Sequence, residues 1–161
     1  MDIAAAVRLQ LERSHERVKK CLADLSPEEA RRSPLPTLSP VVWQVGHIAF
    51  YDGQYAQKAG GGGTVPAEYE GLFKAGTGGP TNYPPIGQVW EVFDKTHAAL
   101  LRIAAEADLG TPVEGQMYAD VGGMLIFSSV HRTYHIGKMT TLRALLAKPV
   151  LFGPPLSATR P

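Results

Sequence analysis

Residues 124–146 read MLIFSSVHRTYHIGKMTTLRALL, and this stretch decides the fold class. Its apolar side chains recur at intervals close to whole helical turns, which places them in one stripe along an α-helix. Pro149 ends the pattern, because proline lacks the N–H that a helix interior needs. The expected apolar stripe carries Met124, Phe127, Tyr134, Leu142 and Leu145. The opposite face, which we expect to meet solvent, carries Ser129, Arg132, Thr133, Thr140 and Arg143.

Three other segments show the same helical period. The first extends from the N-terminal residues to about residue 25, the second covers residues 41–59, and the third covers residues 86–104. Serine caps helix N-termini and proline fits the first helical turn. The pair Ser39 and Pro40 therefore predicts the start of the second helix, and the pair Ser26 and Pro27 predicts a further short helix.

A connection rich in glycine and proline, residues 60–85, separates the second and third helical segments. It allows one helical turn around residues 67–74, and its length is unusual for a compact domain. No segment shows a convincing strand-like alternation of apolar and polar residues. We expect a single domain, residues 1–161, with an all-α fold of the four-helix-bundle type, in which the long connection could cross the bundle.

The composition excludes several classes of function. Sixteen Lys+Arg against fifteen Asp+Glu give a formal net charge of +1, so no strong field attracts nucleic acid or an anionic membrane. The single cysteine, Cys21, cannot form an internal disulfide and fits a reducing compartment. The sequence shows no signal peptide and no apolar stretch long enough to cross a bilayer. We expect a cytoplasmic protein with no nucleic-acid partner and no membrane partner.

The motif HRTYH places His131 and His135 four residues apart. On a helix, at about 100° per residue, the two side chains lie about 40° apart on one face and one turn distant, a spacing that can chelate one metal ion. Both point toward the expected apolar stripe. Two buried imidazoles need partners, because an unsatisfied buried polar ring costs about 1–3 kcal/mol.

His47 lies on the interior face of the segment at residues 41–59, among aromatic side chains. Together with His131 and His135 it can supply three neutral imidazoles to a divalent transition metal and leave coordination positions open for water or substrate. Each histidine taken alone could equally be a core residue that bonds a carbonyl or a tyrosine. The conjunction of three favours a metal site.

Other side chains on the same inward faces are candidates for a substrate pocket. His97 shares the apolar stripe of the third helix and could be a ligand or the partner of one. Lys138 could extend to an end of the bundle or offer a positive charge to an anionic substrate. No inward carboxylate pair is apparent, since Asp52 lies about 140° from His47 around the helix. The candidates are Trp43, Phe50, Tyr51, Gln54, His97, Tyr134 and Lys138.

The chain resembles the DinB/YfiT-like metalloprotein superfamily in two stretches, VWQVGHIAFYDGQY at residues 42–55 and HRTYHIGKMTTLRALL at residues 131–146. The resemblance spans nearly the whole chain. It implies a four-helix bundle in which a histidine of the second helix and an HxxxH pair of the last bind nickel, zinc, iron or manganese, and these positions match His47, His131 and His135. It also implies thiol-dependent S-transferases or isomerases among the relatives, and makes a homodimer plausible.

The segments SPVVWQVGHIAF and EYEGLFKAGTG are also similar to the amino-terminal domain of the iron-dependent sulfoxide synthases that make ergothioneine. Those enzymes carry HxxxHxE, whereas Ile136 and Gly137 follow His135 here. We therefore do not expect this chain alone to catalyse the oxygen-dependent formation of a C–S bond.

Three classes of function remain open at this point. The leading hypothesis is a metal-dependent enzyme, a transferase that presents a low-molecular-weight thiol to an electrophilic substrate, with metal-dependent hydrolysis as a close variant. The second is a stress or resistance protein that binds a metal or a small ligand without turnover. The third is a bundle whose histidines belong only to the core and that acts through protein association.

Overall fold

The computed structural model of the chain describes residues 2–62, 65–77 and 82–153. This part folds into four long helices and two short ones, with no strand among the described residues. The prediction of an all-α bundle is confirmed. None of these helices is long and apolar enough to span a membrane. The helices are α1 (Ile3–Leu22), α2 (Pro27–Arg31), α3 (Val41–Lys58), α4 (Tyr69–Phe73), α5 (Ile86–Glu106) and α6 (Val121–Leu145).

Local sequence signals fix several helix ends. The start predicted at Ser39 and Pro40 is confirmed in position, since α3 begins at Val41, but Pro40 is the N-cap residue and no side chain caps the helix. The Ser26 side chain caps α2 in a capping box with Glu29, which confirms the predicted helix start at this position. α3 ends before Gly60, whose φ of 71° is a left-handed conformation that glycine adopts without a steric penalty. α6 begins three residues earlier than the expected Met124, because the Asp120 side chain accepts a hydrogen bond from the Gly123 amide and caps the helix there.

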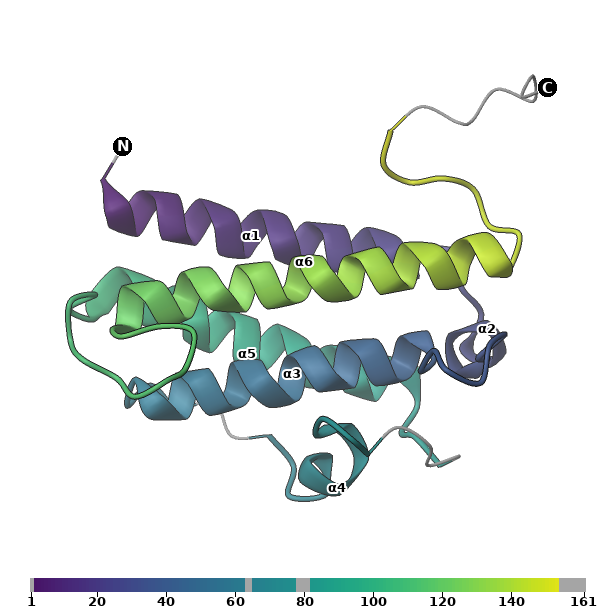
Figure 1. The fold of residues 1–161 in the computed structure, drawn as a ribbon, viewed down its shortest axis with the longest axis horizontal. Helices are drawn as coiled ribbons and strands as arrows, with labels where there is room; N and C mark the ends of the chain where they lie inside the picture. The colour runs from purple at the N-terminus through teal and green to yellow at the C-terminus, as the bar shows by residue number, and fades with distance from the viewer. Residues whose placement is uncertain (1, 63–64, 78–81, 154–161) are drawn as a thin grey trace.

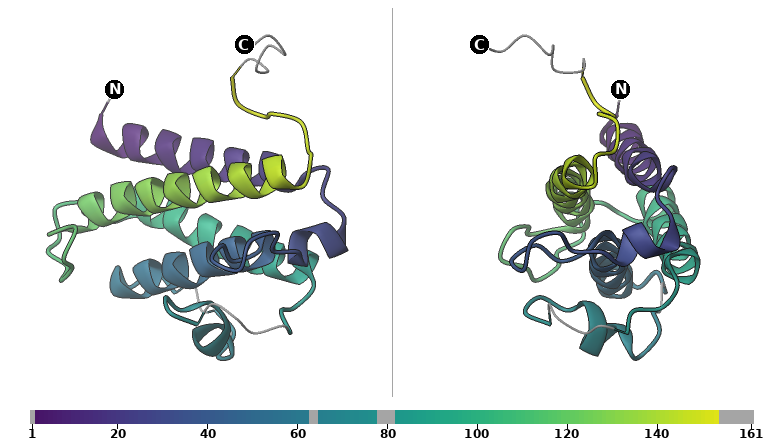
Figure 2. Two further views of the ribbon diagram at one scale, coloured as in Figure 1. Left: turned by 45° about the vertical axis from the view of Figure 1, so that its right-hand side comes forward. Right: turned by 90° about the vertical axis from the view of Figure 1, so that its right-hand side faces the viewer.

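The four long helices occupy the corners of a square when the bundle is viewed end-on (Figure 2, right). α1 runs parallel to α6 and antiparallel to α5, while α3 runs parallel to α5 and antiparallel to α6 (Figure 1). Helices α3 and α5 can be parallel because the connection between them returns along the bundle and carries α4 on the outside of α3. The long connection predicted from the sequence therefore crosses the bundle; its residues 63–64 and 78–81 lie outside the described residues.

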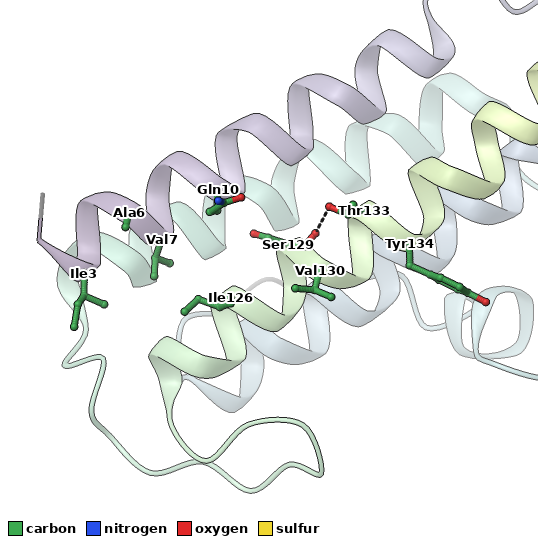
Figure 3. A pocket seen from close by; sticks show the side chains of 9 residues that line it. All are labelled: Ile3, Ala6, Val7, Gln10, Ile126, Ser129, Val130, Thr133 and Tyr134. Carbon is green, nitrogen blue, oxygen red and sulfur yellow. Dashed lines mark hydrogen bonds between the residues drawn. The ribbon is translucent and has the colours of Figure 1, made fainter. Parts of the chain in front are cut away.

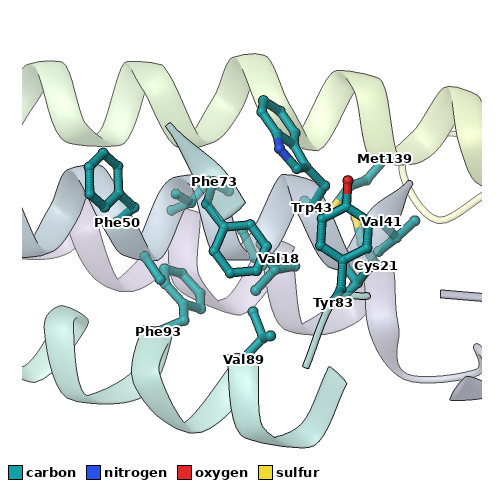
Figure 4. Packing of buried hydrophobic residues seen from close by; sticks show 14 of the residues in the cluster. Val18, Cys21, Val41, Trp43, Phe50, Phe73, Tyr83, Val89, Phe93 and Met139 are labelled. Atoms are coloured by element: carbon teal, nitrogen blue, oxygen red, sulfur yellow. The ribbon is translucent and has the colours of Figure 1, made fainter. Parts of the chain in front are cut away.

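A continuous apolar core joins α4 to the bundle. Phe73 of α4 is fully buried and points into a cluster with Val89 and Phe93 of α5 (Figure 4). Its ring lies against α3 at Gly46, where a Cβ atom would come within 2.3 Å of the Phe73 ring. Glycine at position 46 therefore allows α4 to approach α3 closely.

The prediction that the polar face of α6 meets solvent is wrong for three residues. Ser129, Arg132 and Arg143 are buried, because α6 is covered by α1 as well as by α3. Arg132 forms an ion pair with the buried Asp52 of α3, at 2.8 Å, and Arg143 forms one with Asp24 just after α1. A charged group tolerates burial when an opposite charge compensates it, and a helical wheel cannot reveal such a partner.

Candidate metal centre

Three histidines from two antiparallel helices converge in the bundle. His47 comes from α3, and His131 and His135 come from successive turns of α6. One ring nitrogen of each lies within 4.8 Å of those of the other two. His47 and His135 are buried, and His131 is partly buried. The sequence therefore predicted correctly that these three side chains lie together.

The Nδ1 atom of His47 is engaged by the main chain of α4. It lies 2.7 Å from the carbonyl oxygen of Phe73. A carbonyl oxygen only accepts hydrogen bonds, so His47 carries its proton on Nδ1 and donates it. Its Nε2 lone pair is then free to coordinate a cation.

The Nδ1 atom of His135 is engaged in the same way by a side chain. It lies 2.6 Å from Oε1 of Gln44, and Nε2 of the same amide donates to the carbonyl of Ser39 at 2.9 Å. The second bond fixes which end of the Gln44 amide is the oxygen, so His135 must donate from Nδ1. Its Nε2 lone pair is also free.

His131 is the histidine whose hydrogen bonds to the described residues are incomplete. Its Nε2 lies 3.0 Å from Nε2 of His135, and its Nδ1 is buried with no hydrogen-bond partner among the described residues. With the proton on Nδ1, that donor is unsatisfied and two lone pairs oppose each other at 3.0 Å. With the proton on Nε2, the Nδ1 acceptor is unsatisfied. A cation among the three rings would remove the opposition of lone pairs, and three neutral imidazoles suit a divalent transition ion.

Burial keeps the three imidazoles in the neutral form that coordination requires. Loss of solvation lowers the pKa of His47 and of His131 to about 4, and that of His135 to about 2. The Phe73 carbonyl acts in the opposite direction on the pKa of His47 but does not outweigh burial. The charge of Lys138 lowers the pKa of all three further.

The chain matches a known protein family. The profile of the DinB superfamily matches residues 10–139, a range that contains all three histidines. The chain belongs to the DinB superfamily. No curated protein and no solved structure gives a significant match. For this DinB-superfamily chain, the family and the histidine cluster both fit a divalent metal ion.

Aromatic rings of α3 surround the histidines of this DinB-superfamily site. Trp43 is buried and stacks on His47 with ring centroids 4.5 Å apart. The centroid of the Tyr51 ring lies 4.8 Å from that of His47 and 5.5 Å from that of His131, to which the ring is nearly perpendicular. The structure places Phe50 against Tyr51 rather than against a histidine, and it shows no ring contact or hydrogen bond for the half-buried Gln54.

The expectation that Tyr134 faces the bundle interior is wrong. Its side chain is 60% exposed and lies at one end of a groove of about 710 Å³ between α1 and α6, beside Val130 (Figure 3). Its ring still packs nearly perpendicular to that of His135, with centroids 5.1 Å apart. The Tyr134 side chain therefore lies at the solvent-facing rim of the histidine cluster and not in the bundle interior. Leu145, predicted on the same stripe, is also exposed.

The structure does not bring His97 into the histidine cluster. Its ring stacks on His15 at 4.0 Å, and its Nδ1 lies 3.3 Å from Nη1 of Arg132, which donates to it. His15 in turn bonds Asp94 at 2.7 Å. Burial and the Arg132 charge lower the pKa of His97 to about 3. These groups form a separate polar network that includes the Asp52–Arg132 ion pair; it is buried at Asp52, His97 and Arg132 and reaches solvent at Asp94.

Sequence reasoning missed both groups that orient the ligands. Gln44 is fully buried three residues before His47, and a polar residue in the apolar run VVWQVG was a usable signal. The carbonyl of Phe73 left no signal, because every residue has a carbonyl and only the packing of α4 brings this one to His47.

Proposed function

We propose that this DinB-superfamily protein is a divalent-metal-dependent enzyme, an S-transferase that acts on a low-molecular-weight thiol. One observation carries the proposal: His47 and His135 both donate from Nδ1, which leaves a lone pair on Nε2 of each ring, and one ring nitrogen from each of the three histidines lies within 4.8 Å of the other two. No fourth histidine, cysteine or carboxylate of the described residues joins the cluster. Structural zinc sites complete four protein ligands, whereas catalytic sites keep a position open.

The residues of the site have distinct roles in the proposed enzyme. His47, His131 and His135 would hold the ion, and Gln44 and the Phe73 carbonyl keep two of the rings in the correct tautomer. Trp43 and Tyr51 cover the histidines with apolar surface and limit the access of water. When bound, a divalent ion would lower the pKa of a thiol ligand and fix the position of its sulfur.

The proposed overall reaction is a substitution at an electrophilic carbon. A C–S bond forms between the thiol sulfur and that carbon, and the bond from the carbon to its leaving group breaks. The leaving group departs with the bonding electron pair, and the thiol proton passes to solvent. No external oxidant or reductant is needed.

The direct test is a turnover screen of the metal-loaded protein. Several cellular thiols are offered together with one reactive chloro-aromatic acceptor, and release of chloride is measured alongside the thioether. We expect turnover with at least one thiol that disappears in the metal-free protein and in His131→Ala. Stoichiometric metal without turnover for any thiol would contradict the transferase and favour a protein that binds metal without catalysis.

A further inference from the structure

Lys138 places a positive charge at the rim of the histidine cluster. It lies on α6 one turn beyond His135 and is half-buried. Its Nζ lies 4.4 Å from the centre of the Tyr134 ring, and that ring packs nearly perpendicular to His135. Among the described residues Lys138 forms no ion pair, so its charge lacks a protein counter-ion.

The carboxylates of Asp52 and Asp94, on two helices of the bundle, are engaged away from the cluster. Asp52 of α3 is paired with Arg132 inside the bundle, at 2.8 Å. Asp94 of α5 bonds His15, 2.7 Å away, in the separate polar network. No aspartate or glutamate of the described residues joins the three histidines. The described part of the chain therefore supplies no negative charge directly to the site.

The charge balance of the site favours a ligand with more than one negative charge. Three neutral imidazoles leave the formal charge of +2 on a divalent ion uncompensated, and Lys138 adds a further positive charge at the rim. A thiolate contributes a single negative charge. Uncompensated charge is costly in a partly desolvated site, so a second anionic group on the ligand would be stabilised beside Lys138.

We propose that the thiol substrate carries a second anionic group, a carboxylate, and that Lys138 binds this group while the sulfur occupies the position left open by the three histidines. The proposal rests on the proposed thiol-transferase function and narrows its substrate class. Lys138 acts here as a specificity residue: it selects among thiols and does not hold the metal. The Tyr134 ring stabilises the extended lysine side chain through a cation–π contact.

A pair of thiols of equal chain length tests the charge preference. Cobalt-loaded protein is titrated with 3-mercaptopropionate and with 3-mercaptopropanol, and binding is followed by the thiolate-to-cobalt charge-transfer absorption. The affinity ratio of the two thiols is compared in wild type, Lys138→Met and Lys138→Gln, per equivalent of bound cobalt. We expect the ratio to fall about five- to tenfold in both neutral variants.

Two further variants separate this effect from a general loss of charge. Lys138→Arg retains the positive charge and should retain the wild-type ratio. Lys95→Met removes an exposed lysine of α5 and should also leave the ratio unchanged. Equal ratios in wild type and in the two neutral Lys138 variants, with both thiols bound, would overturn the inference while the proposed function stands. Absence of binding by both thiols would overturn the proposed function and this inference together.

Discussion

The main-chain carbonyl of Phe73 accepts a hydrogen bond from Nδ1 of His47 at 2.7 Å, although 26 residues separate the two in sequence. This bond makes the connection between α3 and α5 part of the histidine cluster. The fully buried Phe73 ring holds the carbonyl in place, since it packs against α3 where Gly46 has no side chain. The orientation of one candidate ligand therefore depends on how α4 docks.

Substitution Gly46→Ala should weaken metal binding without touching a ligand. The new Cβ would meet the Phe73 ring at 2.3 Å, so the ring must shift, and we expect the Phe73 carbonyl to move away from His47 with it. We expect the metal dissociation constant to rise roughly tenfold, as for the loss of other groups that orient a ligand. Competition with a chromophoric chelator measures it. The matched control is Gly71→Ala within α4, where the new Cβ meets nothing within 4 Å; equal affinities for the two variants would refute the link.

The substitution Gln44→Leu should also lower the affinity for the metal, by about 10- to 100-fold, because His135 loses the acceptor that orients its ring. Gln44→Glu retains an acceptor oxygen at this position and should recover most of the affinity, although it loses the donor to Ser39. Isothermal titration of the metal-free variants gives the affinities. The role of Gln44 as an orienting group would be excluded if the leucine and glutamate variants bound equally well.

Removal of one partner of the buried ion pair should be strongly destabilising. Arg132→Met leaves Asp52 buried without its counter-charge, and we expect a loss of about 3–5 kcal/mol in the free energy of unfolding. The double variant Arg132→Met, Asp52→Asn removes both charges and should recover part of this loss. Urea denaturation of wild type, the single variant and the double variant gives the free energy of unfolding of each. A single variant as stable as wild type would show that the ion pair contributes little.

The metal-free protein should lose stability as the pH falls below about 6.5. Burial lowers the pKa of His47, His97, His131 and His135 in the folded state, so the unfolded chain binds more protons between the unfolded and folded pKa values. Each of these groups then contributes a slope of up to about 1.4 kcal/mol per pH unit, and the stability is fully present only above the unfolded value. The interval extends down to about pH 4 for His47 and His131 and to lower pH for the other two.

Urea denaturation at pH 7, 6 and 5 after chelator treatment measures this slope. His97→Gln removes one of the buried titrating groups without changing the histidine cluster, and it should make the slope shallower. A free energy of unfolding that stays constant from pH 7 to pH 5 would contradict the neutral, buried state of these histidines.

The sequence predicted the helices because they follow from local periodicity, and it predicted the histidine cluster because three histidines lie on inward faces and match a family pattern. The spacing of His131 and His135, together with His47 on an apolar face, was sufficient to place the three rings together. The burial of Arg132 was not predictable, because its partner Asp52 lies 80 residues away in sequence on another helix. The exposure of Tyr134 was not predictable either. α6 is covered on two sides, and its helical periodicity alone does not show on which flank α1 packs.

The most direct test of a three-histidine metal centre is elemental analysis of protein purified without a nickel column. We predict about one divalent transition ion per chain in wild type, little in His47→Ala, His131→Ala or His135→Ala, and wild-type content in His97→Gln, whose ring lies outside the cluster. Wild-type metal content in His131→Ala would contradict the metal centre.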